Sequence, residues 1–75
     1  IEYVIEFKIF RDIFQFEKGK TQLAYYAGTL GLNEAVYLVF VPNTVKLADV
    51  REQKETLEGI AIETFIVLYD EKKDF

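Results

Sequence analysis

The sequence contains no cysteine, histidine, methionine or tryptophan among its 75 residues. It therefore cannot form disulfides, zinc sites of the Cys/His type, or catalytic groups built on a Cys nucleophile or a His base. Any acid–base or metal chemistry must use Asp, Glu, Lys or Tyr, and such ligands suit the hard ions Mg²⁺ or Mn²⁺. The lack of cysteine is compatible with a cytoplasmic location, which we expect.

Long apolar runs and an excess of positive charge are also missing. No stretch approaches the roughly 18 apolar residues of a membrane span, so we expect no membrane partner. The net charge is −4, and a negative chain is a poor binder of nucleic acid on its own because phosphate binding relies on Lys and Arg. A phosphate-binding P-loop is excluded as well, because the string Gly19-Lys20-Thr21 lacks the earlier glycine of that motif.

The chain is nevertheless rich in apolar residues, at 51% hydrophobic and 16% aromatic. This is too rich for a disordered chain, and a small domain has little interior to hold so many large side chains. The surplus predicts a surface that a partner covers, by self-association or by contact with an upstream domain. Because the first residue is Ile1 rather than Met, we interpret residues 1–75 as a single partial domain.

Residues 2–10 alternate with period two, which predicts a strand. One face would carry the apolar residues Tyr3, Ile5, Phe7 and Ile9, and the opposite face Glu6 and Lys8. Residues 11–16 are ambiguous, since they could extend this strand or form a loop packed beneath the sheet.

The period changes over residues 17–30, which we predict to be an amphipathic helix. Its apolar stripe comprises Leu23, Tyr26, Ala27 and Leu30, at the spacing of one helix face. Gly31 is placed to end the helix as its C′ residue.

The apolar run 35–41 predicts a buried strand of the parallel kind, which completes a strand-helix-strand core over residues 2–41. Residues 60–69 predict another strand. We favour residues 50–57 as its hairpin partner, turning at Glu58-Gly59, although a short helix within 47–57 is the alternative. The whole is an α/β (α+β) fold with a mixed sheet, one main helix, a hairpin or helix-strand unit over 47–69, and a solvated tail at 70–75.

Two residues of the first strand could carry chemistry. Glu6 and Lys8 lie two apart, so both side chains project from the same face of a rigid strand. A carboxylate can hold a divalent ion near a phosphodiester, and an ammonium can stabilise the charge that develops on phosphorus. The alternative is an ion pair on a solvated strand face.

Gln22 and Tyr26 are one helical turn apart and project from the same side of the helix. A tyrosine in an apolar stripe is more often a core aromatic than a functional group, which is the alternative for Tyr26, and Gln22 could be an exposed flanking residue. We interpret Lys18 and Lys20, near the helix start, as ordinary surface lysines.

Glu6-x-Lys8 in an apolar strand, followed by Gln22-x-x-x-Tyr26 in the next helix and a buried strand, resembles the C-terminal half of the PD-(D/E)XK nuclease superfamily. The likeness is greatest to nuclease-like domains found C-terminal to bacterial ATPase domains. It covers most of the chain, is good from Tyr3 to Val41 and is weaker beyond Asn43. It implies a truncated restriction-endonuclease-like core.

The resemblance implies that Glu6 is a ligand of Mg²⁺ or Mn²⁺, that Lys8 is catalytic, and that Gln22 and Tyr26 support the active site and the DNA backbone. The family's other metal-binding Asp lies on an upstream strand, and no Pro-Asp occurs among the five residues before Glu6. We therefore expect metal-dependent phosphodiester hydrolysis and nucleic-acid binding only from a complete protein, with this chain inactive alone. The alternative is a non-catalytic interaction or oligomerisation module.

Overall fold

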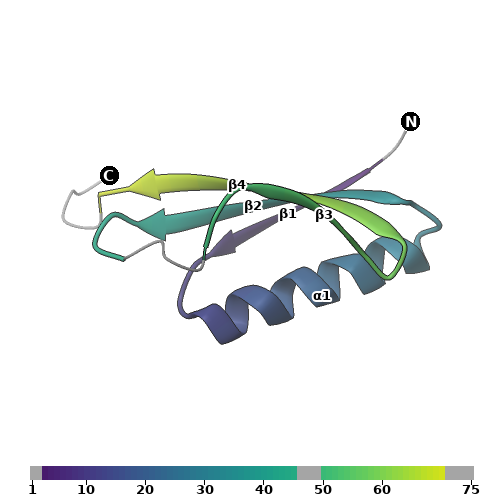
Figure 1. Cartoon of the computed structure of the whole chain (residues 1–75), viewed down its shortest axis with the longest axis horizontal. Helices are drawn as coiled ribbons and strands as arrows, with labels where there is room; N and C mark the ends of the chain where they lie inside the picture. Colours follow the sequence, from purple (N-terminus) through teal and green to yellow (C-terminus); the bar gives the residue numbers. More distant parts are fainter. Residues whose placement is uncertain (1–2, 46–49, 71–75) are drawn as a thin grey trace.

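The computed structural model describes residues 3–45 and 50–70. A four-stranded sheet carries one helix on one of its faces (Figure 1). The elements in chain order are β1 (Val4–Ile9), α1 (Ile13–Thr29), β2 (Glu34–Pro42), β3 (Gln53–Leu57) and β4 (Ile60–Tyr69). The strand order is β1-β2-β4-β3, in which β2 is parallel to both β1 and β4 and β3 is antiparallel to β4.

This architecture confirms the expected strand-helix-strand unit, the hairpin and the mixed sheet. Residues 53–57 form the first strand of the hairpin rather than a helix, and this strand begins three residues later than the expected position 50. The first strand begins at Val4, two residues later than expected, and the expected position Glu2 lies outside the described residues. Positions 46–49 and 71–75 of the expected last third and tail also lie outside them.

The helix begins at Ile13, four residues before the predicted start, because Asp12 caps it. The Asp12 carboxylate accepts a hydrogen bond of 2.7 Å from the backbone N–H of Gln15, which satisfies a donor that the first turn leaves free. The ambiguous segment 11–16 is therefore mostly the first turn of α1, and Phe16 is buried beneath it.

The helix α1 ends at Thr29, and Gly31 is its C′ residue, as the sequence predicts. Gly31 adopts a φ of 76°, which a residue with a side chain rarely adopts. The backbone N–H of Leu32 donates to the Ala27 carbonyl at 2.9 Å, and that of Gly31 donates to the Gly28 carbonyl at 3.0 Å. These two bonds form a Schellman motif, which satisfies carbonyls that the end of the helix leaves free.

The core lies between α1 and one face of the sheet. The strands contribute Ala35, Tyr37, Val39, Val41, Ile60 and Ile62, and the helix contributes Phe16, Leu23, Ala24 and Ala27. Two members of the predicted apolar stripe, Tyr26 and Leu30, are half exposed instead. The buried face is rotated from the prediction because it also includes Phe16 and Lys20 of the first turns.

The other face of the sheet is not covered by any segment that the structure describes (Figure 1). The register of β1 with β2 confirms the predicted alternation. The residues of β1 on this open face, Ile5, Phe7 and Ile9, are all at least 45% exposed, as is Tyr3 just before the strand. Phe65 and Val67 of β4 are exposed on the same face. We call these six residues the open face.

The β3–β4 hairpin turns on two residues. Glu58 and Gly59 have φ values of 52° and 78°, the backbone of a type I′ turn. Just before β3 begins, the Glu52 carboxylate accepts a hydrogen bond of 3.0 Å from the Ile66 N–H of β4. The side chain thus supplies an acceptor where the backbone of β3 no longer pairs with β4. In the described residues, no helix combines the length and apolarity that crossing a membrane requires.

Candidate functional site

A small cavity between β1 and α1 brings together the four site residues that the sequence predicts. Its volume is about 190 Å³. β1 contributes Glu6 and Lys8, and α1 contributes Gln22 and Tyr26 together with Gly19 and Leu23. The strand and the helix that follows it therefore form two walls of one site.

The strand register explains why Glu6 and Lys8 face the helix. They pair with Tyr37 and Val39 of β2, both of which are fully buried under α1. Because paired residues on neighbouring strands share a face of the sheet, Glu6 and Lys8 also project toward the helix side. β1 lies at the edge of the sheet, however, so Glu6 is exposed and Lys8 only partly buried.

On the helix wall, the four-residue spacing of Gln22 and Tyr26 places both side chains beside the cavity. Both are exposed, and they lie one turn apart beside the buried Leu23. Tyr26 is 52% exposed, so the interpretation as a core aromatic is wrong and its ring lines the cavity instead. An amide and a phenolic hydroxyl at this wall can both donate hydrogen bonds to phosphate oxygens.

Gly19 gives the cavity its floor because it allows Tyr37 to pack directly against the helix backbone. A β-carbon at position 19 would lie 2.5 Å from the Tyr37 hydroxyl oxygen and 3.6 Å from Cε of Lys8. The Tyr37 hydroxyl donates a buried hydrogen bond of 3.0 Å to the Phe16 carbonyl, which anchors the first turn of α1 to β2.

Tyr37 is neutral at physiological pH. Burial in the core, together with the negative charges of Glu17 and then Glu6, raises the pKa of the Tyr37 phenol from 10.0 to about 12. The tyrosine is therefore a structural hydrogen-bond donor beneath the cavity, and the carboxylate of Glu6 lies near enough to affect it electrostatically.

Lys20 is not an ordinary surface lysine, since it is only 2% exposed. Its Nζ lies 2.9 Å from Oε2 of Glu55 on β3 and 3.4 Å from Oε2 of Glu17, and 4.8 Å from the centre of the Phe16 ring. It therefore forms ion pairs with two carboxylates and ties the helix to the edge strand β3. No local sequence pattern indicates this role, because Glu55 is brought to it by the hairpin.

The cavity does not by itself form a metal site. Glu6 is the one carboxylate among the residues lining it, whereas Mg²⁺ and Ca²⁺ are normally held by several oxygen ligands. Across the described ranges 3–45 and 50–70, no three acidic, His or Cys side chains cluster at metal-binding geometry. The residues that line the cavity therefore do not complete a divalent-ion site.

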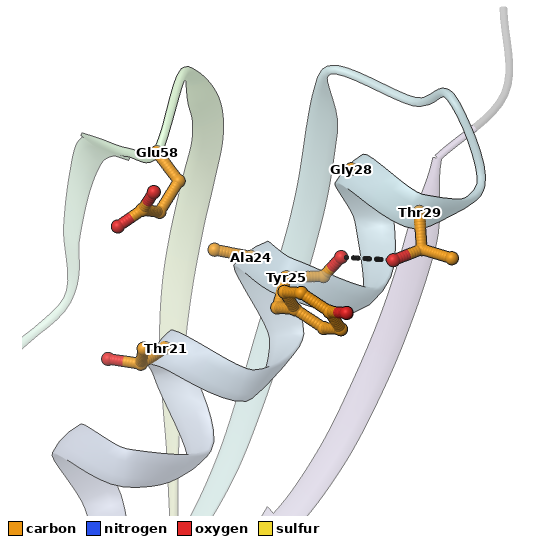
Figure 2. Close-up of a pocket in the computed structure, with 6 residues that line it drawn as sticks. All are labelled: Thr21, Ala24, Tyr25, Gly28, Thr29 and Glu58. Carbon is orange, nitrogen blue, oxygen red and sulfur yellow. Dashed lines mark hydrogen bonds between the residues drawn. The ribbon is translucent and has the colours of Figure 1, made fainter.

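A second, larger hollow of about 420 Å³ lies on the far side of the helix, beside the hairpin turn. Figure 2 shows Glu58 on the turn and the other labelled residues on α1. The hydroxyls of Thr21 and Thr29 donate to the carbonyls of Glu17 and Tyr25, so they are already occupied. Only Glu58 offers a free charge here, and the smaller cavity remains the candidate site.

Comparison of this chain with protein-family models, with curated proteins and with solved structures found no match.

Proposed function

We propose that this chain carries one half of a PD-(D/E)XK-type nuclease site, in which the cavity binds a phosphodiester. The observation that supports the proposal is the shared cavity of Glu6, Lys8, Gln22 and Tyr26. These four residues are the ones that the two motifs single out, and they come from different elements.

The roles follow from the chemistry of each group. The Lys8 ammonium provides the positive charge that attracts a phosphate and stabilises charge developing on it. The Gln22 amide and the Tyr26 hydroxyl donate hydrogen bonds that hold the phosphate against the helix. Glu6 repels a phosphate unless a divalent ion is present, and a divalent ion would polarise the phosphate and lower the pKa of a bound water. Hydrolysis is therefore expected only when another segment or another chain supplies further acidic ligands.

The test is Mn²⁺-dependent cleavage of DNA by the full-length protein, with Glu6→Ala and Lys8→Ala as the variants. We expect each variant to lose roughly 100-fold or more in rate, the scale for removing one group that stabilises transition-state charge. Lys54→Ala is the matched control, because Lys54 is an exposed strand lysine that lines a different hollow. Wild-type rates in both cavity variants would remove these residues from catalysis.

The isolated 75-residue chain gives a second test. We expect it to cleave nothing and to bind Mn²⁺ only in the millimolar range, the regime of sites with few ligands. Isothermal titration that shows micromolar binding to the isolated chain would contradict the half-site interpretation.

A second candidate function, a non-catalytic interaction module, is favoured by the open face. Phe7 is 62% exposed there, and a shallow hollow of about 620 Å³ lies between Phe7, Phe40 and Val67. Contiguous apolar surface of this kind marks protein–protein contacts. If replacing Phe7 and Phe65 by Ser abolishes binding to a partner while Gln22→Ala, a change in the cavity wall on α1, leaves that binding intact, the interaction function stands independently of the cavity.

A further inference from the structure

The outer edge of β1 is the least protected part of the sheet. The sheet order places β1 at one edge and β3 at the other, and in the described part of the chain no strand pairs with the outer side of β1. β3 is short and polar, with the sequence QKETL, which discourages pairing with another strand. β1 reads VIEFKI, an apolar edge that can accept a further strand.

One hydrogen bond shows which backbone groups of β1 are free. The Phe10 N–H donates to the Phe40 carbonyl at 2.8 Å, so the backbone of Phe10 points toward β2. Because the direction alternates along a strand, Glu6 and Lys8 also direct their backbone groups toward β2. The N–H and C=O groups of Ile5, Phe7 and Ile9 therefore point outward and lack a strand to pair with among the described elements.

The sequence of β1 is complementary to itself about Phe7. In an antiparallel pair of two β1 strands centred on Phe7, Ile5 lies opposite Ile9 of the second copy, and Glu6 lies opposite Lys8 of the second copy. The outward-pointing residues then meet as hydrogen-bonded pairs, which gives about six backbone hydrogen bonds. Both charged pairs fall at the closer, non-hydrogen-bonded positions, where opposite charges stabilise the pairing.

Neighbouring registers are disfavoured. A shift of two residues in one direction places Glu6 opposite Glu6 of the second copy, and in the other direction Lys8 opposite Lys8, and like charges directly opposite are destabilising. A shift of one residue removes the hydrogen bonds, because outward-pointing groups would then face inward-pointing ones. The register centred on Phe7 satisfies backbone, charge and apolar pairing together.

We infer that the occupant of this edge is a second copy of the chain, so that two sheets join through β1 into one continuous eight-stranded sheet with a twofold axis at Phe7. α1 packs mainly against β2 and β4, which leaves the edge accessible. Charge complementarity specifies this occupant, because β1 carries both Glu6 and Lys8, and each would pair with the other residue in the second copy.

The pairing has one consequence for the cavity, and this consequence alone rests on the proposed function. The Glu6 carboxylates of the two copies would be diagonal neighbours, with Cα atoms about 7–8 Å apart. A dimer therefore brings a second carboxylate near a site that contains only one. Sedimentation and cross-linking test the pairing, whereas Mn²⁺ titration and cleavage test the site.

Introduced cysteines test the register directly, since the chain has no cysteine of its own. At a hydrogen-bonded antiparallel pair the Cα atoms are about 5.5 Å apart, which a disulfide can span. We expect Phe7→Cys to cross-link to a covalent dimer on mild oxidation. Ile5→Cys is the matched control on the same face, because the two Ile5 Cα atoms would be about 14 Å apart and beyond disulfide reach.

Charge variants test the complementarity. Lys8→Glu places like charges in both pairs, and we expect roughly tenfold or greater weakening of the dimer in sedimentation equilibrium. The double variant Glu6→Lys with Lys8→Glu restores opposite charges, and its dimer should recover. Circular dichroism of each variant confirms that it is folded. A wild-type chain that stays monomeric at millimolar concentration, equal cross-linking of both cysteine variants, or a dimer unaffected by Lys8→Glu would each overturn the inference.

Discussion

Replacing Gly19 with Ala tests the contact that forms the floor of the cavity. In an ordinary helix interior this change stabilises by about 1 kcal/mol, because Ala has the higher helix propensity. Here the new β-carbon would lie 2.5 Å from the Tyr37 hydroxyl oxygen, which its hydrogen bond to the Phe16 carbonyl holds in place. Overpacking of this kind costs about 1–3 kcal/mol, so we expect a net loss of up to about 2 kcal/mol in the free energy of unfolding.

Gly28→Ala is the matched control in the same helix. Its new β-carbon would meet only Cδ1 of Ile60, at the ordinary contact distance of 3.8 Å. We expect this variant to gain about 0.5–1 kcal/mol. Urea unfolding at one fixed protein concentration, followed by circular dichroism, compares the two variants with the wild type.

A double-mutant cycle identifies the clashing atom. Once Tyr37→Phe removes the hydroxyl, the nearest atom to the new β-carbon is Cζ at 3.4 Å, which is tolerable. Gly19→Ala should therefore be at least about 1 kcal/mol less harmful in the Tyr37→Phe background than alone. If Gly19→Ala stabilises the wild type as much as Gly28→Ala does, the packing account of Gly19 is refuted.

Four further predictions concern the core and the hairpin. Because the pKa of Tyr37 is raised to about 12, the protonated phenol contributes about 2–3 kcal/mol to the free energy of unfolding below pH 10, and this contribution is lost as the pH rises toward about 12. Urea unfolding measured against pH should show this loss, and Tyr37→Phe should reduce it. Glu55→Gln should destabilise the fold because it leaves the charge of Lys20 with one partner, whereas Lys20→Met should cost less in the same unfolding assay. Glu58→Asn should raise the melting temperature, because Asn tolerates the positive φ of this type I′ turn better than Glu does. Thr64→Val should raise the free energy of unfolding, measured in urea, by about 1 kcal/mol, because the buried Thr64 Oγ1 has no hydrogen-bond partner among the described residues. An unchanged or lower free energy of unfolding would contradict this.

The first strand and the direction of its side chains followed from period alone. Alternation in β1 places Ile5 and Phe7 on one face and Glu6 on the other, and this needs no tertiary information. The helix start could also have been found. Asp12 followed by Gln15 is the spacing of a capping box, but the apolar pair Ile13-Phe14 between them also fits a continuing strand.

Other features depend on contacts between elements and have no local signal. Lys20 is buried because the helix crosses the sheet at the level of Glu55, which is 35 residues away in the sequence. The helical apolar stripe was misplaced for the same reason. Once Phe16 and Lys20 occupy the sheet side of the first turns, Tyr26 is rotated toward the edge, where only β1 lies beside it.

Packing and function can be separated residue by residue at the cavity. Gly19 is explained by Tyr37 alone, so a glycine at this position is no evidence for a ligand. Glu6, Gln22 and Tyr26 contribute nothing to the buried core, and exposed polar positions of this kind normally tolerate substitution within about 0.5 kcal/mol. Stability therefore gives no reason for these side chains to converge on one hollow. If their replacement leaves both unfolding and phosphodiester chemistry unchanged, their convergence is a consequence of the strand and helix geometry, and β1 retains only its role as a pairing edge.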